Sequence, residues 1–170
     1  MQYYWRITKY NPNHRDSLGR YTKDTWISYS DIGKTYDNTI LDIKHYLYIE
    51  NLYIKSVLLF MDYLNITKLQ ANNLENWSEL IPDEHITDNM ITLFKTIKNN
   101  DWITKEYIPD TIKLILREQL WSNLSFNNKL CVNFGFDYYM YIGSFLPCTK
   151  IIGSIKQLGL FVENCTKPLD

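Results

Sequence analysis

Several short groups of residues in the 170-residue chain contain side chains that could support catalysis. The tripeptide His14-Arg15-Asp16 matches part of the catalytic loop of protein kinases. Kinase chemistry also needs a glycine-rich phosphate loop, a strand lysine and a second metal-binding aspartate, and the sequence contains none of them. The tripeptide also stands in front of any possible nucleotide-binding domain, so we interpret its charges as those of a solvated loop.

The densest group of possible metal ligands is formed by Asp83, Glu84, His85 and Asp88. On a helix, Glu84 and Asp88 would lie one turn apart with His85 beside Asp88, an arrangement that suits a hard divalent cation. Acidic residues are also favoured at a helix N-terminus, because they face the positive end of its dipole. No second ligand set with metal-site spacing occurs elsewhere, so we favour helix capping and predict neither a metal nor another cofactor.

Nucleophilic catalysis would need a cysteine or serine next to a histidine base. Neither a nucleophile elbow nor a papain-type signature surrounds Cys131, Cys148 or Cys165. Gly33-Lys34-Thr35 matches the end of a Walker A loop, but Ser28 occupies the position where that loop needs its first glycine. We therefore predict no catalytic residues and expect a protein that is not an enzyme.

The run Asp137-Tyr138-Tyr139-Met140-Tyr141 is the strongest candidate for an interaction surface. On a strand, Tyr139 and Tyr141 fall on one side, and Tyr138 and Met140 fall on the other. A strand with rings on both faces either is buried twice or shows one row of rings to a partner. Both alternatives are open at this point.

Composition restricts the class of protein and its partners. The chain is 45% apolar and 22% charged, as in globular domains, and its 15% aromatic residues indicate a ring-rich core or exposed aromatic contacts. The net charge is -1, and only four of the eighteen basic residues are arginine. Because a protein that neutralises phosphates needs an excess of basic side chains, we predict that nucleic acid is not a partner.

The sequence also indicates where the protein resides. Residues 46–64 form the longest apolar stretch, and the charged residues within it make it too polar for a membrane span. The three cysteines are odd in number and widely spaced, which fits free thiols in a reducing compartment. The first residues lack the basic and apolar regions of a secretory signal, so we expect a cytoplasmic protein without a membrane partner.

Hydrophobic periodicity predicts the elements that position these residues. Alternation of apolar and polar residues predicts a strand at residues 2–9, followed by a polar segment at 10–25 that is either a long loop or a hairpin and is called the 10–25 loop below. Thr39 and Asp42 approximate a capping box, and apolar residues at helical spacing predict a helix over about residues 39–64. Such a helix is long enough to cross the whole domain and to form the base on which a sheet packs.

Shorter elements complete the predicted fold. Pro82-Asp83-Glu84 suits a helix start, Asp88 could cap a short helix, and Pro109 opens a further helix that stops near Ser122. We expect strands at 66–74 and 158–162 and a hairpin within 127–144. Residues 1–170 are therefore predicted as a single α+β domain, in which the first and last strands share an antiparallel sheet that packs against a helical middle with one long helix.

Four segments of the chain resemble a family of small bacterial immunity proteins. The segments are Trp5-Arg6-Ile7-Thr8-Lys9-Tyr10-Asn11-Pro12, Ser30-Asp31-Ile32-Gly33, Phe134-Gly135-Phe136-Asp137-Tyr138-Tyr139-Met140-Tyr141 and Gly159-Leu160-Phe161-Val162-Glu163. Proteins of this kind are encoded beside polymorphic or contact-dependent toxins. The resemblance, which runs nearly end to end, implies that the chain binds the catalytic domain of a cognate toxin, often a nuclease, and blocks its active site.

Three functions are carried forward from the sequence. The first is toxin neutralisation, the second is a metal-dependent enzyme with a dispersed site around His85 and Asp88, and the third is a mobile-element protein that binds a host factor. For a protein partner, candidate surfaces are the 10–25 loop, the tyrosine hairpin and the exposed face of the helix at 39–64. The residues predicted to bind the partner are Arg15, Asp16, Asp83, Glu84, Asp88, Asp137, Tyr139 and Tyr141.

Overall fold

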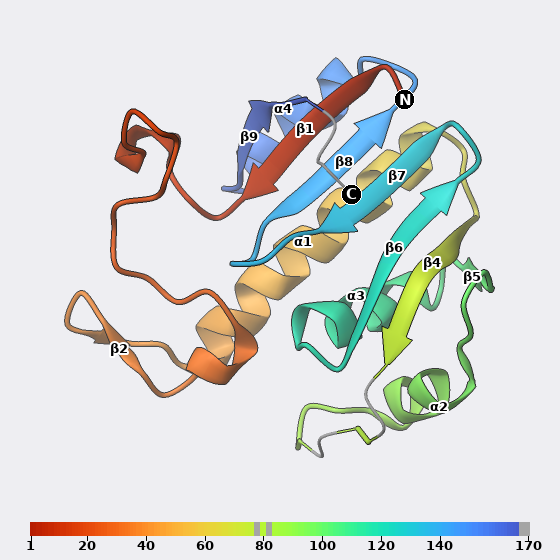
Figure 1. The fold of residues 1–170 in the computed structure, drawn as a ribbon, viewed down its shortest axis with the longest axis horizontal. Helices are drawn as coiled ribbons and strands as arrows, with labels where there is room; N and C mark the ends of the chain where they lie inside the picture. Colours follow the sequence, from red (N-terminus) through yellow and green to blue (C-terminus); the bar gives the residue numbers. More distant parts are fainter. Residues whose placement is uncertain (77–78, 81–82, 167–170) are drawn as a thin grey trace.

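The computed structural model describes residues 1–76, 79–80 and 83–166, and its centre is one seven-stranded sheet (Figure 1). The strand order is β5-β4-β6-β7-β8-β1-β9, and every pair of neighbours is antiparallel. The strands of this sheet are β1 (Tyr3–Thr8), β4 (Lys68–Asn76), β5 (Trp102–Thr104), β6 (Leu120–Phe126), β7 (Leu130–Phe134), β8 (Met140–Ser144) and β9 (Phe161–Asn164). A separate small hairpin joins β2 (Thr35–Tyr36) to β3 (Thr39–Ile40).

Four helices accompany the sheet in the described part of the chain: α1 (Ile43–Tyr63), α2 (Asp88–Thr96), α3 (Ile108–Leu116) and α4 (Thr149–Gln157). Helix α1 runs diagonally behind the sheet and contacts both α3 and α4 (Figure 1). This arrangement confirms the predicted α+β class, the single long helix and the pairing of the first strand with the last. Among the described residues, none of the helices combines the length and the apolar character of a membrane span.

The two faces of the sheet differ in burial because side chains alternate along each strand. On the face that packs against α1, Ile7, Val132 and Ile142 are completely buried. Between them, Arg6 and Tyr141 point to the opposite face and are partly exposed. The hydrophobic core therefore lies between the sheet and its helices, and the opposite face carries the polar and aromatic side chains.

The start of the long helix differs from the prediction. Helix α1 begins at Ile43 because the Asp42 carboxylate accepts a hydrogen bond of 2.7 Å from the His45 N–H and caps the first turn. Thr39 is not part of this cap but pairs with Tyr36 across the β2–β3 hairpin. The predicted helix at 39–64 is thus confirmed over 43–63, with its first turn replaced by a strand.

The prediction was wrong where the third helix was extended to Ser122. Helix α3 ends at Leu116, Glu118 adopts a left-handed φ of 57°, and the chain continues as β6, which lies between β4 and β7 in the sheet. The apolar spacing continued to Leu120 by coincidence, since Leu120, Ser122 and Leu124 are buried with the period of a strand. The short strand β5 and the helix α4 were not predicted.

Two further boundaries differ from the prediction. The last strand begins at Phe161, because Leu158 still closes α4 and Gly159 turns the chain with a φ of 101°. The expected helix start at Pro82-Asp83-Glu84 is also displaced: Pro82 lies outside the described residues, 83–86 form a turn, and Thr87 caps α2. Asp88 consequently lies in the first turn of α2 and is not its N-cap.

A buried ion pair joins α1 to the turn after α3. The Arg117 guanidinium donates two hydrogen bonds of 2.7 Å to the carboxylate oxygens of Glu50, and each side chain is only 3% exposed. A third donor of Arg117 reaches the backbone carbonyl of His85 at 2.8 Å, and the guanidinium lies 5.4 Å from the ring of Tyr29. Arg117 therefore connects four segments that are distant in the sequence.

We expect the substitution Glu50→Ala to lower the free energy of unfolding by about 3–5 kcal/mol, because it leaves the Arg117 charge buried without its partner. The double variant Glu50→Leu/Arg117→Met should recover most of this loss, since it removes both charges and keeps apolar volume. Urea denaturation followed by circular dichroism measures both values. A loss below about 1 kcal/mol for Glu50→Ala would contradict the structural role of the pair.

Candidate partner-binding site

Arg15 and Tyr139, which come from two separate predicted surfaces, meet on the side of the sheet opposite α1. Arg15 donates hydrogen bonds to the Tyr139 hydroxyl at 3.0 Å and to Glu163 at 3.2 Å, and its side chain is only 7% exposed. Arg6 donates to the same carboxylate at 2.9 and 3.2 Å. Although burial opposes the shift, the two guanidinium groups lower the pKa of Glu163. The contacts of Arg15 thus fasten the 10–25 loop to the sheet.

Two other predicted residues of this region are placed differently. The Asp16 carboxylate accepts hydrogen bonds from the Leu18 and Arg20 N–H groups and pairs with the Arg20 guanidinium, so it shapes the tip of the loop. Tyr141 lies beside Tyr139, with 6.4 Å between the ring centroids, and is half-buried. The tyrosine row therefore packs against Arg6 and Arg15, while Tyr138 on the other side is buried in the core.

The acidic segment at 83–88 supports local structure. The Asp83 carboxylate accepts hydrogen bonds from the Tyr29 hydroxyl and from the His85 N–H, and Glu84 lies 3.3 Å from the His85 ring. Asp88 faces the N-terminal end of α2, where a negative charge is favourable. Within the described ranges, no group of three or more histidine, cysteine, aspartate or glutamate residues could hold a metal ion.

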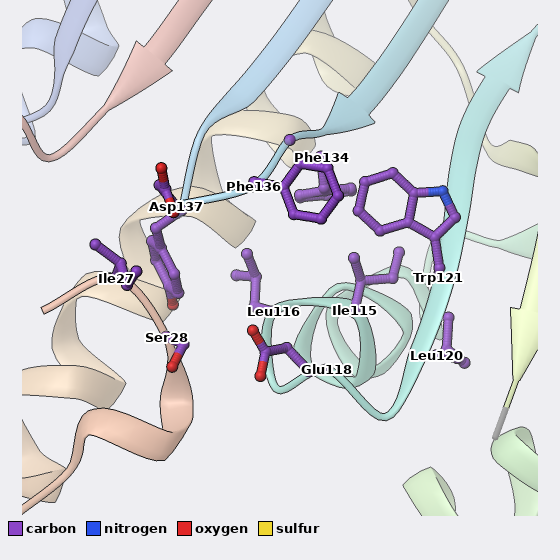
Figure 2. A pocket seen from close by; sticks show the side chains of 12 residues that line it. Ile27, Ser28, Ile115, Leu116, Glu118, Leu120, Trp121, Phe134, Phe136 and Asp137 are labelled. Atoms are coloured by element: carbon purple, nitrogen blue, oxygen red, sulfur yellow. The ribbon is translucent and has the colours of Figure 1, made fainter. Parts of the chain in front are cut away.

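The feature that best suits ligand binding is an open pocket, here named the apolar cleft. Three segments form it: residues 27–28, the chain from the end of α3 into β6, and the turn between β7 and β8 (Figure 2). Its volume is about 470 Å³. The twelve residues that line it are Ile27, Ser28, Ile115, Leu116, Glu118, Leu120, Trp121, Phe134, Gly135, Phe136, Asp137 and Tyr138.

An exposed aromatic pair forms the rim of the apolar cleft. The Phe136 ring is 86% exposed and stacks against the Trp121 indole, with 6.2 Å between centroids and 23° between planes (Figure 2). Ile27 is 44% exposed at another point of the rim. A large apolar side chain exposed to this degree beside an apolar cavity is typical of a binding surface.

The turn that presents Phe136 has an unusual backbone. Asp137 and Tyr138 have φ values of 59° and 61°, a left-handed conformation that is costly for a tyrosine. Two buried hydroxyls compensate: Tyr10 donates to the Asp137 carbonyl at 2.5 Å, and Tyr53 donates to the Tyr138 carbonyl at 2.9 Å. Burial raises the pKa of both hydroxyls, so both remain protonated donors near neutral pH. The turn is therefore held in place from within the core.

The second wall, between α3 and β6, is anchored in a similar way. The Tyr46 hydroxyl donates to the Leu116 carbonyl at 3.1 Å, which satisfies one of the free carbonyl groups at the end of α3. Arg117 follows and is fixed by Glu50, and Glu118 then turns the chain with its positive φ. These contacts place the Glu118 side chain at the cleft and set the start of β6, the strand that carries Trp121.

The third wall is the segment that carries Ile27 and Ser28. Their N–H groups donate to the Asp31 carboxylate at 2.8 and 3.2 Å. The Lys9 ammonium donates to the carbonyl of the buried Trp26 at 2.6 Å and lies 3.9 Å from the centroid of its ring. All three walls of the apolar cleft are thus positioned by hydrogen bonds from buried or half-buried side chains.

The charge of the apolar cleft is negative. Glu118 and Asp137 line it from two different walls, and both side chains are exposed. No lysine, arginine or histidine occurs among the twelve described residues that line it. The site therefore combines an apolar floor with an acidic rim, which suits a ligand that is both apolar and cationic.

Of the predicted partner-binding residues, only Asp137 lines this cleft. Sequence reasoning missed Phe136, Trp121 and Glu118. One signal was present for Phe136, because a phenylalanine between Gly135 and Asp137 occupies a turn, where an apolar side chain is out of place. Trp121 and Glu118 carried no such signal, since they were assigned to a helix that ends before them.

We expect Tyr53→Phe to lower the free energy of unfolding by about 1–3 kcal/mol, because it leaves the Tyr138 carbonyl and the Lys9 N–H without their buried partner. Urea denaturation measures the change. Tyr48→Phe is the matched control, because Tyr48 is 57% exposed on the same helix and should lose almost nothing. Equal stability of the two variants would show that the hydroxyl does not support the turn.

Burial lowers the pKa of the Lys9 ammonium to about 7, and the charge of Asp31 opposes this shift. An unfolded lysine titrates near pH 10.4, so between pH 7 and 10 the unfolded chain binds more protons than the folded chain. The free energy of unfolding should therefore rise with pH in this window, by up to about 2 kcal/mol between pH 7 and 9 relative to Lys9→Met. The cysteines contribute equally to the pH dependence of the wild type and of Lys9→Met, so their contribution cancels in this comparison. Parallel pH profiles of the two proteins would refute the prediction.

No protein-family model, no curated protein and no solved structure matches this chain. The likeness to immunity proteins accordingly depends on the four segments quoted above. The function is therefore inferred from three features of the site: an exposed aromatic pair, an apolar floor and an acidic rim.

Proposed function

We propose that this chain is an immunity protein, which binds a cognate bacterial toxin domain and blocks its active site, with a nuclease as the favoured class of toxin. The observation that carries the proposal is the Phe136 ring, which is 86% exposed and stacked on Trp121 at the mouth of the apolar cleft. A large aromatic side chain in this position is energetically favourable mainly when another molecule covers it.

The pair has the character of an interface anchor. Most of the binding energy in protein interfaces comes from a few residues, often aromatic, that sit next to well-packed pockets. Phe136 and Trp121 are aromatic and adjoin a pocket whose walls are fixed by Tyr10, Tyr53 and the Arg117–Glu50 pair. A rigid anchor loses little conformational entropy on binding, which favours affinity.

The acidic rim supports a nuclease as the target. Enzymes that bind nucleic acid hold the phosphates with lysine and arginine, so their substrate grooves are positively charged. Glu118 and Asp137 present negative charge beside the exposed ring and would attract such a groove. The whole chain has a net charge of only -1, so this attraction is local to the site.

Co-expression with the toxin domain that the proposal expects beside this gene tests the proposal. We expect the wild-type chain to restore growth, and we expect Phe136→Ser to weaken binding of the purified toxin domain by about 30-fold or more, as for a hot-spot residue. Tyr48→Ser, which removes an exposed ring on α1, is the control and should bind normally. Failure of the folded wild-type chain to restore growth would contradict the immunity function.

The other two functions carried forward predict different results. A metal-dependent enzyme around His85 would bind a stoichiometric metal ion and lose activity in His85→Ala. A mobile-element protein would bind a factor of the host cell and would give no protection against a toxin. No observation on the described residues favours either function over toxin binding.

A further inference from the structure

We infer that the apolar cleft receives a protein segment in which an apolar side chain is flanked by lysine or arginine. This inference rests on the proposed function, because it names the chemistry of the toxin segment that docks. It predicts that the chain recognises a basic and apolar motif, and that Glu118, Asp137 and Phe136 determine this preference.

The floor of the apolar cleft provides the apolar half of the recognition. Five buried side chains line it: Ile115, Leu116, Leu120, Phe134 and Tyr138. The volume of about 470 Å³ lies within the range of roughly 300–1,000 Å³ for pockets that enclose an organic ligand. A large aliphatic or aromatic side chain therefore fits and would bury its surface against these residues.

The rim provides the ionic half of the recognition. Glu118 and Asp137 stand at the mouth on different walls, and the lining residues include no base among those described. A neutral apolar segment would gain nothing from these carboxylates, and an acidic segment would be repelled by them. A cation next to the apolar side chain would meet a carboxylate in an exposed position, which favours rapid association and selectivity more than affinity.

The shape of the site favours a protein segment over a small molecule. The Phe136 ring lines the cavity and is also 86% exposed, so a protruding ring and a hollow lie next to each other. A small molecule that filled the hollow would touch only the side of the Phe136 ring that lines it and leave the rest of the ring exposed. A protein surface can enter the hollow with one side chain and cover the ring with its neighbours, as paired hot spots do.

Selection of random 12-residue peptides displayed on phage, against the immobilised chain, tests the inference directly. We expect the selected peptides to combine a large apolar residue with adjacent lysine or arginine. A synthetic peptide from the selection should shift the indole N–H resonance of Trp121 in the NMR spectrum. Ile27→Trp, which enlarges an exposed side chain at the rim, should weaken peptide binding more than 10-fold by filling the mouth.

The double variant Asp137→Asn/Glu118→Gln tests the ionic half. Asparagine tolerates the left-handed backbone at position 137, so the turn is preserved. We expect about 3- to 10-fold weaker peptide binding at low salt and a reduced dependence on salt. Glu106→Gln, a neutralisation at an exposed position that does not line the cleft, is the control and should change neither.

Three outcomes of the peptide experiments would overturn the inference. The first is a selection that enriches acidic or uncharged peptides, and the second is peptide binding that Ile27→Trp and the double neutral variant leave unchanged. The third is binding of hexylamine as tight as that of the peptides, which would identify a small cationic molecule as the occupant. The immunity function is tested separately: a toxin that is neutralised equally well by Ile27→Trp would refute the inference and leave the function intact.

Discussion

The structure depends most on the ion pair between Arg117 and Glu50, which buries a full positive and a full negative charge at the junction of α1, α3 and β6. A charge removed from water is tolerated only when its partner is held in good geometry, so this pair requires α1 and the turn after α3 to keep one relative position. The same guanidinium holds the His85 carbonyl and lies over Tyr29. The wall of the apolar cleft that carries Glu118 includes Ile115 and Leu116 just before Arg117 and continues at the next residue.

Tyrosine hydroxyls perform the corresponding task for the turn that carries Phe136. Tyr10, Tyr46 and Tyr53 each donate to a backbone carbonyl in or beside the cleft walls, and their rings pack within the core. The high aromatic content of the chain is therefore used mainly inside the molecule. At the cleft, a strained turn exposes the Phe136 ring on the surface. Backbone strain of this kind is typical of sites under functional constraint.

Much of the fold could be predicted because periodicity is local. The alternation of β1 and of the β7–β8 hairpin and the helical spacing of α1 each appear within one continuous segment. Strand β6 was missed because apolar spacing continued across the turn at Glu118, whose left-handed backbone has no glycine to mark it. Most of the site could not be predicted, since Glu50 and Arg117 are 67 residues apart and Tyr10 lies 127 residues from the turn it supports. Of the predicted partner-binding residues, only Asp137 lines the cleft, and the tyrosine run that follows it is the feature that identifies it in the sequence.

The central claim is that this protein acts through a shaped surface centred on Phe136 and the apolar cleft. Hydrogen–deuterium exchange, compared between the free chain and its complex with the proposed toxin partner, tests this claim most directly. The account predicts slower exchange at residues 117–121 and 134–138, with little change at the sheet edge formed by β5. A stable complex in which protection is confined to the 10–25 loop or to the outer surface of α1 would contradict it.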